Sequence, residues 1–227
     1  MNVGVLGTGI VGQTVAGKLA ELGHDVVIGT RDVDAALARS EGPRPGLPSF
    51  AQWLEQHPEV RAGTFAEAAA HGELLVNATA GTGSLEALEA AGADNLDGKI
   101  LIDISNPLDF SRGMPPTLSV SNDDSLGEQI QRGYPGSKVV KTLNSVTAAV
   151  MVNPASVGEG DHHAFVSGDD AGAKAEVTRL LQDGFGWRNV LDLGDITTAR
   201  GTEMYLALWI RLMSVRGSAM FNVRVVG

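Results

Sequence analysis

The sequence contains no cysteine among its 227 residues. This absence excludes disulfides, thiolate nucleophiles, iron–sulfur clusters and the zinc sites that depend on cysteine. Basic residues are also scarce, since 17 Lys and Arg stand against 27 Asp and Glu and the formal net charge is −10. Such a charge argues against a nucleic acid or an anionic membrane as a partner. A phosphate-bearing ligand must therefore be held by local features, such as a helix N-terminus and individually placed arginines.

Long apolar runs are absent as well. None approaches the roughly 18 residues that a bilayer-spanning helix needs. The segment Asn2–Leu6, which follows Met1 directly, has the pattern of a buried strand and not that of a signal peptide. We therefore expect a cytoplasmic protein with no membrane partner. Hydrophobic residues make up 43% of the chain, which predicts a packed core.

Short apolar runs alternate with helical patterns along the chain, which is typical of βαβ units. The pattern predicts an α/β protein with a Rossmann, doubly wound, mostly parallel sheet and a small C-terminal α/β extension. We assign residues 1–144 to the Rossmann domain. Residues 145–227 are assigned to a smaller domain that completes the substrate pocket and supplies a probable dimer contact. The expected strands are 3–6, 25–28, 60–63, 74–78, 100–104, 139–143, 164–167 and 189–193, and the main expected helices are 11–22, 33–39, 49–57, 64–70, 85–91, 125–132, 146–152, 171–181 and 197–213.

A glycine-rich fingerprint follows the first expected strand. Its G-x-G-x-x-G pattern is common in isolation, but here it lies between a strand and a helix, and the next strand ends about 20 residues later. The first glycine permits a tight turn, the second lets the backbone approach a pyrophosphate, and the third lets helix and strand pack closely. The fingerprint therefore predicts a dinucleotide site built from Gly7, Thr8, Gly9, Ile10, Val11 and Gly12.

The end of the second expected strand indicates which dinucleotide is bound. An NAD-specific fold places Asp or Glu there to accept hydrogen bonds from the ribose hydroxyls. This chain instead has Thr30 and Arg31, a hydroxyl and a guanidinium that suit a 2′-phosphate. Asp32 follows one position later and weakens the argument slightly. Arg31 could also be an ordinary solvated side chain, but NADP(H) is the better prediction.

The nicotinamide of a doubly wound fold lies beyond the carboxyl ends of the fourth and fifth strands. Small residues and backbone groups follow both strands, as a flat ring requires, and the predicted contacts are Ala78, Thr79, Ala80, Ser105, Asn106 and Pro107. The sixth strand supplies two catalytic candidates, Lys141 and Asn144. Lys141 could act as a general acid or be solvated or paired. Asn144 could orient a ring or cap the next helix.

No arrangement of Ser, His and Asp, no pair of carboxylates and no metal-ligand spacing stands out. The pair His162-His163 invites a metal interpretation, but it begins an expected strand, where neighbouring side chains diverge. We expect a structural role for this pair and no metal site.

Several motifs together carry a family resemblance. Besides the fingerprint they are 29–31 (Gly-Thr-Arg), 105–108 (Ser-Asn-Pro-Leu), 139–145 (Val-Val-Lys-Thr-Leu-Asn-Ser), 168–170 (Gly-Asp-Asp) and the region from Thr202-Glu203 through 208–212. This set resembles the deazaflavin-dependent NADP reductases, that is, the coenzyme F-420:NADP oxidoreductase family and its predicted dinucleotide-binding relatives. The resemblance implies direct hydride transfer between NADPH and a stacked deazaflavin, with coenzyme F-420 as co-substrate.

Alternative functions remain open at this point. The chain could reduce a small carbonyl or imine, or it could be a non-catalytic NADP(H)-binding redox sensor. The segments 42–48 and 109–122 look like insertions that border the second pocket. The apolar helix from Thr197 and the tail 221–226 suggest a homodimer contact or a lid over the pocket. On that helix Met204, Trp209 and Met213 have core spacing and are expected to pack inside the chain. The expected partner is a small-molecule redox co-substrate.

Overall fold

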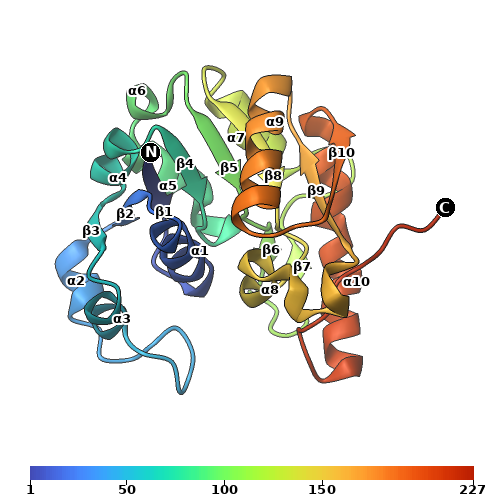
Figure 1. Ribbon diagram of the computed structural model, residues 1–227, viewed down its shortest axis with the longest axis horizontal. Helices are drawn as coiled ribbons and strands as arrows, with labels where there is room; N and C mark the ends of the chain where they lie inside the picture. Colours follow the sequence, from blue (N-terminus) through green and yellow to red (C-terminus); the bar gives the residue numbers. More distant parts are fainter.

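A computed structural model describes all 227 residues, and an eight-stranded sheet lies at its centre (Figure 1). The strand order is β10-β9-β8-β5-β4-β1-β2-β3, and every neighbouring pair is parallel except β8 with β9. The order from β3 to β8 is that of a doubly wound nucleotide-binding fold. The predicted fold class is therefore confirmed. The strands are β1 (Asn2–Leu6), β2 (Asp25–Thr30), β3 (Val60–Thr64), β4 (Leu74–Asn77), β5 (Ile100–Asp103), β8 (Lys138–Thr142), β9 (His163–Ser167) and β10 (Asn189–Gly194).

Helices cover both faces of this sheet. Successive strand residues point to opposite faces, and Val3 and Val5 accordingly belong to one core cluster while Leu6 belongs to the other. The first cluster packs against α1 (Ile10–Glu21), α2 (Val33–Leu37), α3 (Phe50–Gln56), α8 (Ala148–Val152) and α9 (Ala171–Arg179). The second packs against α4 (Phe65–His71), α5 (Ser84–Ala91), α6 (Ala93–Leu96), α7 (Leu126–Gly133) and α10 (Ala199–Arg216).

Side-chain caps define where several helices begin. Ser49 with Gln52 forms a capping box at α3, and Thr64 with Glu67 forms one at α4. The Asp170 side chain accepts a hydrogen bond from the Ala173 N–H and caps α9. Short helical turns flank other elements: η1 (Gly81–Gly83) precedes α5, and η2 (Pro154–Ser156) and η3 (Gly158–Gly160) follow α8. The π-helical turn η4 (Leu180–Gly184) continues α9, and η5 (Ile196–Thr198) precedes α10.

Several expected boundaries were wrong. The strand β2 continues past Ile28 to Thr30, because Gly29 and Thr30 still pair with β3. A two-stranded antiparallel hairpin, β6 (Leu108–Asp109) with β7 (Thr117–Leu118), lies in the segment that the sequence leaves irregular. Met204 was expected in the core, but it lies 38% exposed on the outer face of α10.

The sheet continues across the division that the sequence suggests at residue 144. Strand β9 pairs with β8, and the first core cluster includes Val140 as well as Val166 and Trp187. The division into residues 1–144 and 145–227 therefore stays a prediction about folding units. No helix combines the length and the apolar composition needed to cross a membrane.

Candidate functional site

The fingerprint loop has the geometry that each glycine predicts. Gly7 has a φ of 111°, which favours glycine. A Cβ on Gly12 would lie 1.8 Å from the Gly7 carbonyl oxygen, so only glycine lets α1 pack this closely. A Cβ on Gly9 would meet no protein atom within 4 Å. The backbone at Gly9 is therefore open on the side where a ligand approaches.

The first turn of α1 is available to an anion. Its N-cap residue, Gly9, has no side chain to bind the free N–H groups at the start of the helix. Those groups and the helix dipole favour a phosphate. Gln13 braces the loop, because its Nε2 donates to the Thr8 carbonyl oxygen over 2.8 Å. These features fit the diphosphate of a dinucleotide.

Thr30 and Arg31 lie at the end of β2, next to the fingerprint. Thr30 is buried, whereas the Arg31 side chain is 76% exposed and contacts Glu86 of α5 at 3.4 Å. The Asp32 carboxylate accepts a hydrogen bond from the Ala35 N–H at 2.9 Å and caps α2. The acidic residue that weakens the prediction of NADP(H) thus has a local structural task, as the N-cap of α2.

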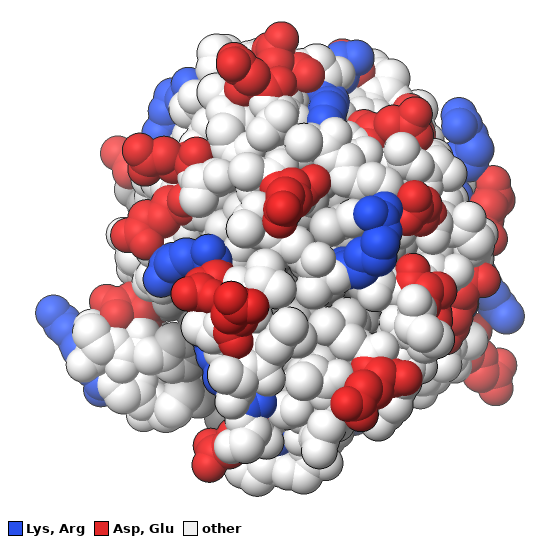
Figure 2. Space-filling model, turned by 90° about the vertical axis from the view of Figure 1, so that its left-hand side faces the viewer, with Lys and Arg blue, Asp and Glu red and all other residues white.

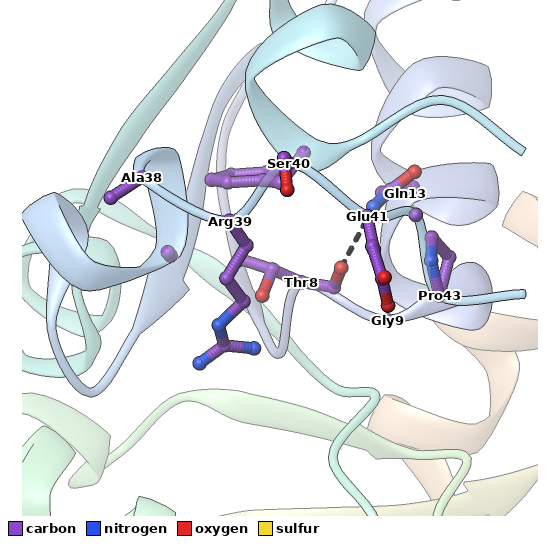
Figure 3. Close-up of a pocket in the computed structure, with 11 residues that line it drawn as sticks. Thr8, Gly9, Gln13, Ala38, Arg39, Ser40, Glu41 and Pro43 are labelled. Atoms are coloured by element: carbon purple, nitrogen blue, oxygen red, sulfur yellow. Dashed lines mark hydrogen bonds between the residues drawn. The ribbon is translucent and has the colours of Figure 1, made fainter.

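A cavity of about 510 Å³, here called the fingerprint cavity, opens beside the glycine-rich fingerprint loop. Arg39 and Glu41 reach from the segment after α2 toward the loop that carries Thr8 and Gly9 (Figure 3). Phe50 of α3 closes the apolar side. The segment 42–48, which the sequence marks as an insertion, contributes Gly42 and Pro43. This segment therefore borders the fingerprint side of the cleft. The expectation that it borders the second pocket is wrong, because none of its residues lines the hollow beyond β4 and β5.

A second hollow of about 220 Å³, here called the strand-end pocket, lies beyond the carboxyl ends of β4 and β5. A Cβ on Gly81 would lie 1.9 Å from the Asn106 carbonyl oxygen, so the two strand-end loops are in close contact. Pro107 does not line the pocket, and its carbonyl oxygen instead accepts the Ser119 N–H. The lining residues are Val11, Ala78, Thr79, Ala80, Gly81, Thr82, Ile104, Ser105, Asn106, Leu108 and Phe110.

Asn144 is buried behind this pocket and is paired with Asn106. The Asn144 Nδ2 donates to Asn106 Oδ1 at 3.0 Å, and the Asn106 Nδ2 donates to the Asn144 carbonyl oxygen at 2.8 Å. The alternative that Asn144 caps the next helix is wrong, because the N-cap of α8 is Thr147. Asn144 therefore orients Asn106, which does line the pocket.

Lys141 is completely buried and forms an ion triad with Asp103 and Glu203. Its Nζ lies 2.8 Å from Asp103 Oδ2, 2.8 Å from Glu203 Oε1 and 2.6 Å from the Ser105 carbonyl oxygen. Burial alone would lower the pKa of Lys141, but the two carboxylates together raise it above its usual value. All three ammonium protons are engaged. Lys141 is not among the residues that line the strand-end pocket, so it has no direct contact with a ligand there.

Asp103 connects this triad to the strand-end loops. Its Oδ1 accepts hydrogen bonds from Asn77 Nδ2 at 2.9 Å, from the Ser105 N–H at 3.1 Å and from Ser105 Oγ at 2.6 Å. The Asn77 Oδ1 in turn accepts the Thr79 hydroxyl at 2.7 Å. Sequence reasoning missed Asn77, Asp103 and Glu203. A lysine inside a buried strand requires buried counter-charges, and that signal could have directed attention to the carboxylates.

His162 has the structural role that the sequence suggests. It is buried, its Nε2 lies 2.9 Å from the Pro154 carbonyl oxygen, and its ring meets Trp187 edge-on.

On the face of the molecule that carries α2 and α3, acidic and basic side chains are scattered and form no continuous basic patch (Figure 2).

Known proteins show the same fold and sequence features. A family model described as NADP oxidoreductase, coenzyme F-420-dependent, matches residues 2–107. The F-420-dependent NADP reductase of Methanothermobacter marburgensis is 26% identical over 217 residues, which are 93% of this chain and 92% of that protein. The rat metalloreductase STEAP3 is 29% identical over 217 residues, and the chain spans 37% of its length.

A crystal structure from Arthrobacter sp. FB24 extends the likeness to the whole molecule. It is named as a candidate F-420-dependent NADP reductase and is 58% identical to this chain. The TM-score is 0.95, and the match covers 100% of both chains. The chain therefore belongs to the coenzyme F-420-dependent NADP oxidoreductase family and is an NADP-dependent oxidoreductase.

Proposed function

We propose that the protein passes a hydride between NADPH and a flat redox partner, coenzyme F-420, in the strand-end pocket. The observation that carries this proposal is the composition of the pocket. None of its eleven lining residues is Asp, Glu, His, Lys, Arg or Tyr. Direct hydride transfer depends on orientation and on exclusion of water, and it needs no positioned acid or base. When bound, the nicotinamide supplies the hydride, and the proton that balances deazaflavin reduction comes from solvent.

The pocket residues would hold the nicotinamide by shape and by hydrogen bonds. Ala78, Ala80 and Gly81 leave room for a flat ring, and Thr79, Ser105 and Asn106 supply polar groups around it. A small number of placed polar groups in an otherwise apolar pocket is the usual way to fix a ring.

Phe110 offers a contact surface for the second ring. It follows β6 in the hairpin, lines the strand-end pocket and is 55% exposed. Aromatic side chains bind flat rings by offset stacking. The segment 109–122, proposed from the sequence to border the second pocket, supplies this side chain.

The other end of the cofactor would bind at the fingerprint. The N–H groups at the start of α1 would hold the diphosphate. Thr30 and Arg31 would hold the 2′-phosphate, and Arg39 lines the fingerprint cavity. Discrimination against NAD(H) would come from the Arg31 guanidinium.

A reductase of small carbonyls or imines is less well supported. Such an enzyme needs a proton donor at the reacting atom. Lys141 was the candidate, but its ammonium is held by Asp103, Glu203 and the Ser105 carbonyl. No titrating side chain lines the strand-end pocket itself.

Anaerobic turnover tests the proposed acceptor. NADPH oxidation is followed by absorbance with coenzyme F-420 and, separately, with FMN, FAD and ferric chelates. We expect turnover with F-420 to exceed turnover with each other acceptor. Faster oxidation by a flavin or by a ferric chelate, or no reaction with F-420, would overturn the choice of acceptor.

We also propose that α10 forms a homodimer contact. Met204, Leu208 and Val215 are exposed on this helix. Tyr205 and Trp209, on the same helix, each bury a polar atom that finds no partner within the chain. Light scattering during gel filtration measures the mass in solution. A monomeric mass at micromolar concentration would overturn the proposal.

A further inference from the structure

The ion triad joins the strand-end pocket to a helix that lies outside it. Glu203 belongs to α10, and its carboxylate contacts Lys141 on one side and the start of α7 on the other. The Leu126 N–H donates to Glu203 Oε2 at 2.8 Å, and the Gly127 N–H donates to Glu203 Oε1 at 3.0 Å. Side-chain exposure is 0% for Asp103 and Lys141 and 2% for Glu203.

The charges of this cluster do not cancel within it. Two carboxylates face one ammonium, and the excess negative charge is held by N–H groups at the start of α7 and by Asn77 and Ser105. Leaving a buried charge without its partner costs free energy, so each side chain of the cluster is held in its position. The positions of the polar groups around Asp103 are therefore coupled to the position of Glu203.

Two side chains carry this coupling into the pocket. Ser105 binds Asp103 through both its N–H and its hydroxyl, and Thr79 is held through Asn77. Both residues line the strand-end pocket. Lys141 and Glu203 do not line it, and their effect must pass through Asp103.

We propose that Lys141 and Glu203 are positioning residues, which act through Asp103 to hold Ser105 and Thr79 in the geometry that receives the nicotinamide. This inference rests on the proposed placement of the nicotinamide in the strand-end pocket, and it does not depend on which acceptor takes the hydride. The consequence is that a change on α10, outside the pocket, alters the binding of one half of the cofactor.

Binding of two ligands separates this role from a general structural one. NADP⁺ reaches both ends of the site, whereas 2′,5′-ADP lacks the nicotinamide and reaches the fingerprint alone. Calorimetry of Glu203→Gln should show NADP⁺ weakened about three- to tenfold. The affinity for 2′,5′-ADP should change by less than about twofold.

Glu128→Gln is the matched control. Glu128 lies on α7 and binds Arg200 of α10, with Arg200 Nε donating to Glu128 Oε2 at 2.8 Å. It is a buried carboxylate in the same α7–α10 contact, but it has no bond to Lys141 or Asp103. We expect Glu128→Gln to lower the melting temperature without a selective loss of NADP⁺. Equal weakening of both ligands by Glu203→Gln, or the same selective loss in Glu128→Gln, would overturn the proposal.

If Glu203→Gln does not fold, Glu203→Asp takes its place in the binding test. It keeps the charge but is one methylene too short to reach both Lys141 and α7, and the same selective loss is expected. Failure of F-420 turnover, with the selective loss intact, would refute the acceptor alone. If the wild-type protein binds NADP⁺ no better than 2′,5′-ADP, the nicotinamide placement and the positioning role both fail.

Discussion

The two ends of the cofactor cleft are built in different ways. At the fingerprint end, the groups proposed to hold the cofactor are backbone N–H groups at the start of α1 and the largely exposed side chain of Arg31. At the strand-end pocket, the polar groups that line the pocket are fixed from behind by buried side chains, above all Asp103 and Lys141.

This difference predicts how each end responds to substitution. At the fingerprint end, a changed side chain should alter affinity and leave the fold intact, because the groups involved are exposed or have no side chain. Behind the strand-end pocket, a change in the ion triad should cost stability, because it leaves buried charges without partners.

Lys141→Ala should have the largest effect, and this effect should be a loss of folding stability. It leaves Asp103 and Glu203 facing each other in a buried site, which should cost about 3–5 kcal/mol in the free energy of unfolding. Urea unfolding measures this loss. A loss below about 1 kcal/mol would mean that the triad is not a strong buried interaction.

The pH dependence of that loss has a definite sign. The pKa of Lys141 is raised in the folded protein. Its contribution is therefore fully present below the unfolded pKa of about 10.4 and is lost as pH rises through the higher folded value. The stability gap between wild type and Lys141→Ala should therefore narrow above about pH 10.4. A gap that does not narrow in this alkaline range would contradict this assignment.

Gly9→Val should abolish cofactor binding without unfolding the protein. The added side chain meets no protein atom near its Cβ, but it occupies the space where the diphosphate approaches. NADPH affinity, measured by fluorescence titration, should fall by more than about a hundredfold while the melting temperature stays near that of the wild type. Gly12→Ala is the contrasting variant, because its Cβ would clash with the Gly7 carbonyl oxygen and should lower stability instead. Normal NADPH binding by Gly9→Val would place the diphosphate elsewhere.

Arg31→Ala should weaken NADPH and spare NADH. A charge-assisted hydrogen bond to the 2′-phosphate is worth about 1.5–3 kcal/mol, or about ten- to a hundredfold in affinity. Arg39→Ala is the comparison variant, and we expect it to lower NADPH affinity by only about threefold. The loss is smaller because Arg39 lies in the segment after α2 and not at the end of β2. Calorimetry measures the affinity for both cofactors. Equal losses of NADPH and NADH affinity would refute the role of Arg31.

Asn144→Ala should have the smallest effect, on turnover. It removes one of the two hydrogen bonds that orient Asn106, and no proton transfer depends on it. We expect kcat to fall by about tenfold or less through ring orientation. Because no side chain that lines the pocket titrates near neutrality, kcat should vary little between about pH 6 and 8. A loss beyond about a thousandfold would point to a required catalytic group.

Local patterns predicted the fold and the fingerprint end well. Strand and helix periodicity, the capping boxes at Ser49 and Thr64 and the glycines at 7, 9 and 12 are all local signals, and the structure contains each of them. The strand-end contacts were predicted from topology, and all but Pro107 line the pocket. The polar network behind them was not foreseen, because Lys141 and Glu203 are 62 positions apart and no periodicity pairs them.

The hairpin was missed for a related reason. Its strands have two residues each and hold together through pairing between Leu108 and Leu118, which no alternating pattern announces. The exposure of Met204 was not predicted, because an apolar helix face that contacts a second molecule has the same composition as one in a core.

An isotope label on the nicotinamide shows whether the hydride passes straight from one ring to the other. NADPH carrying deuterium at C4 in one of its two stereochemical positions is oxidised anaerobically with coenzyme F-420, and the reduced product is analysed by mass spectrometry. We expect deuterium from one of the two positions to arrive in the reduced deazaflavin and deuterium from the other to stay on the nicotinamide. Deuterium lost to water, or transferred equally from both positions, would contradict direct transfer in a fixed geometry.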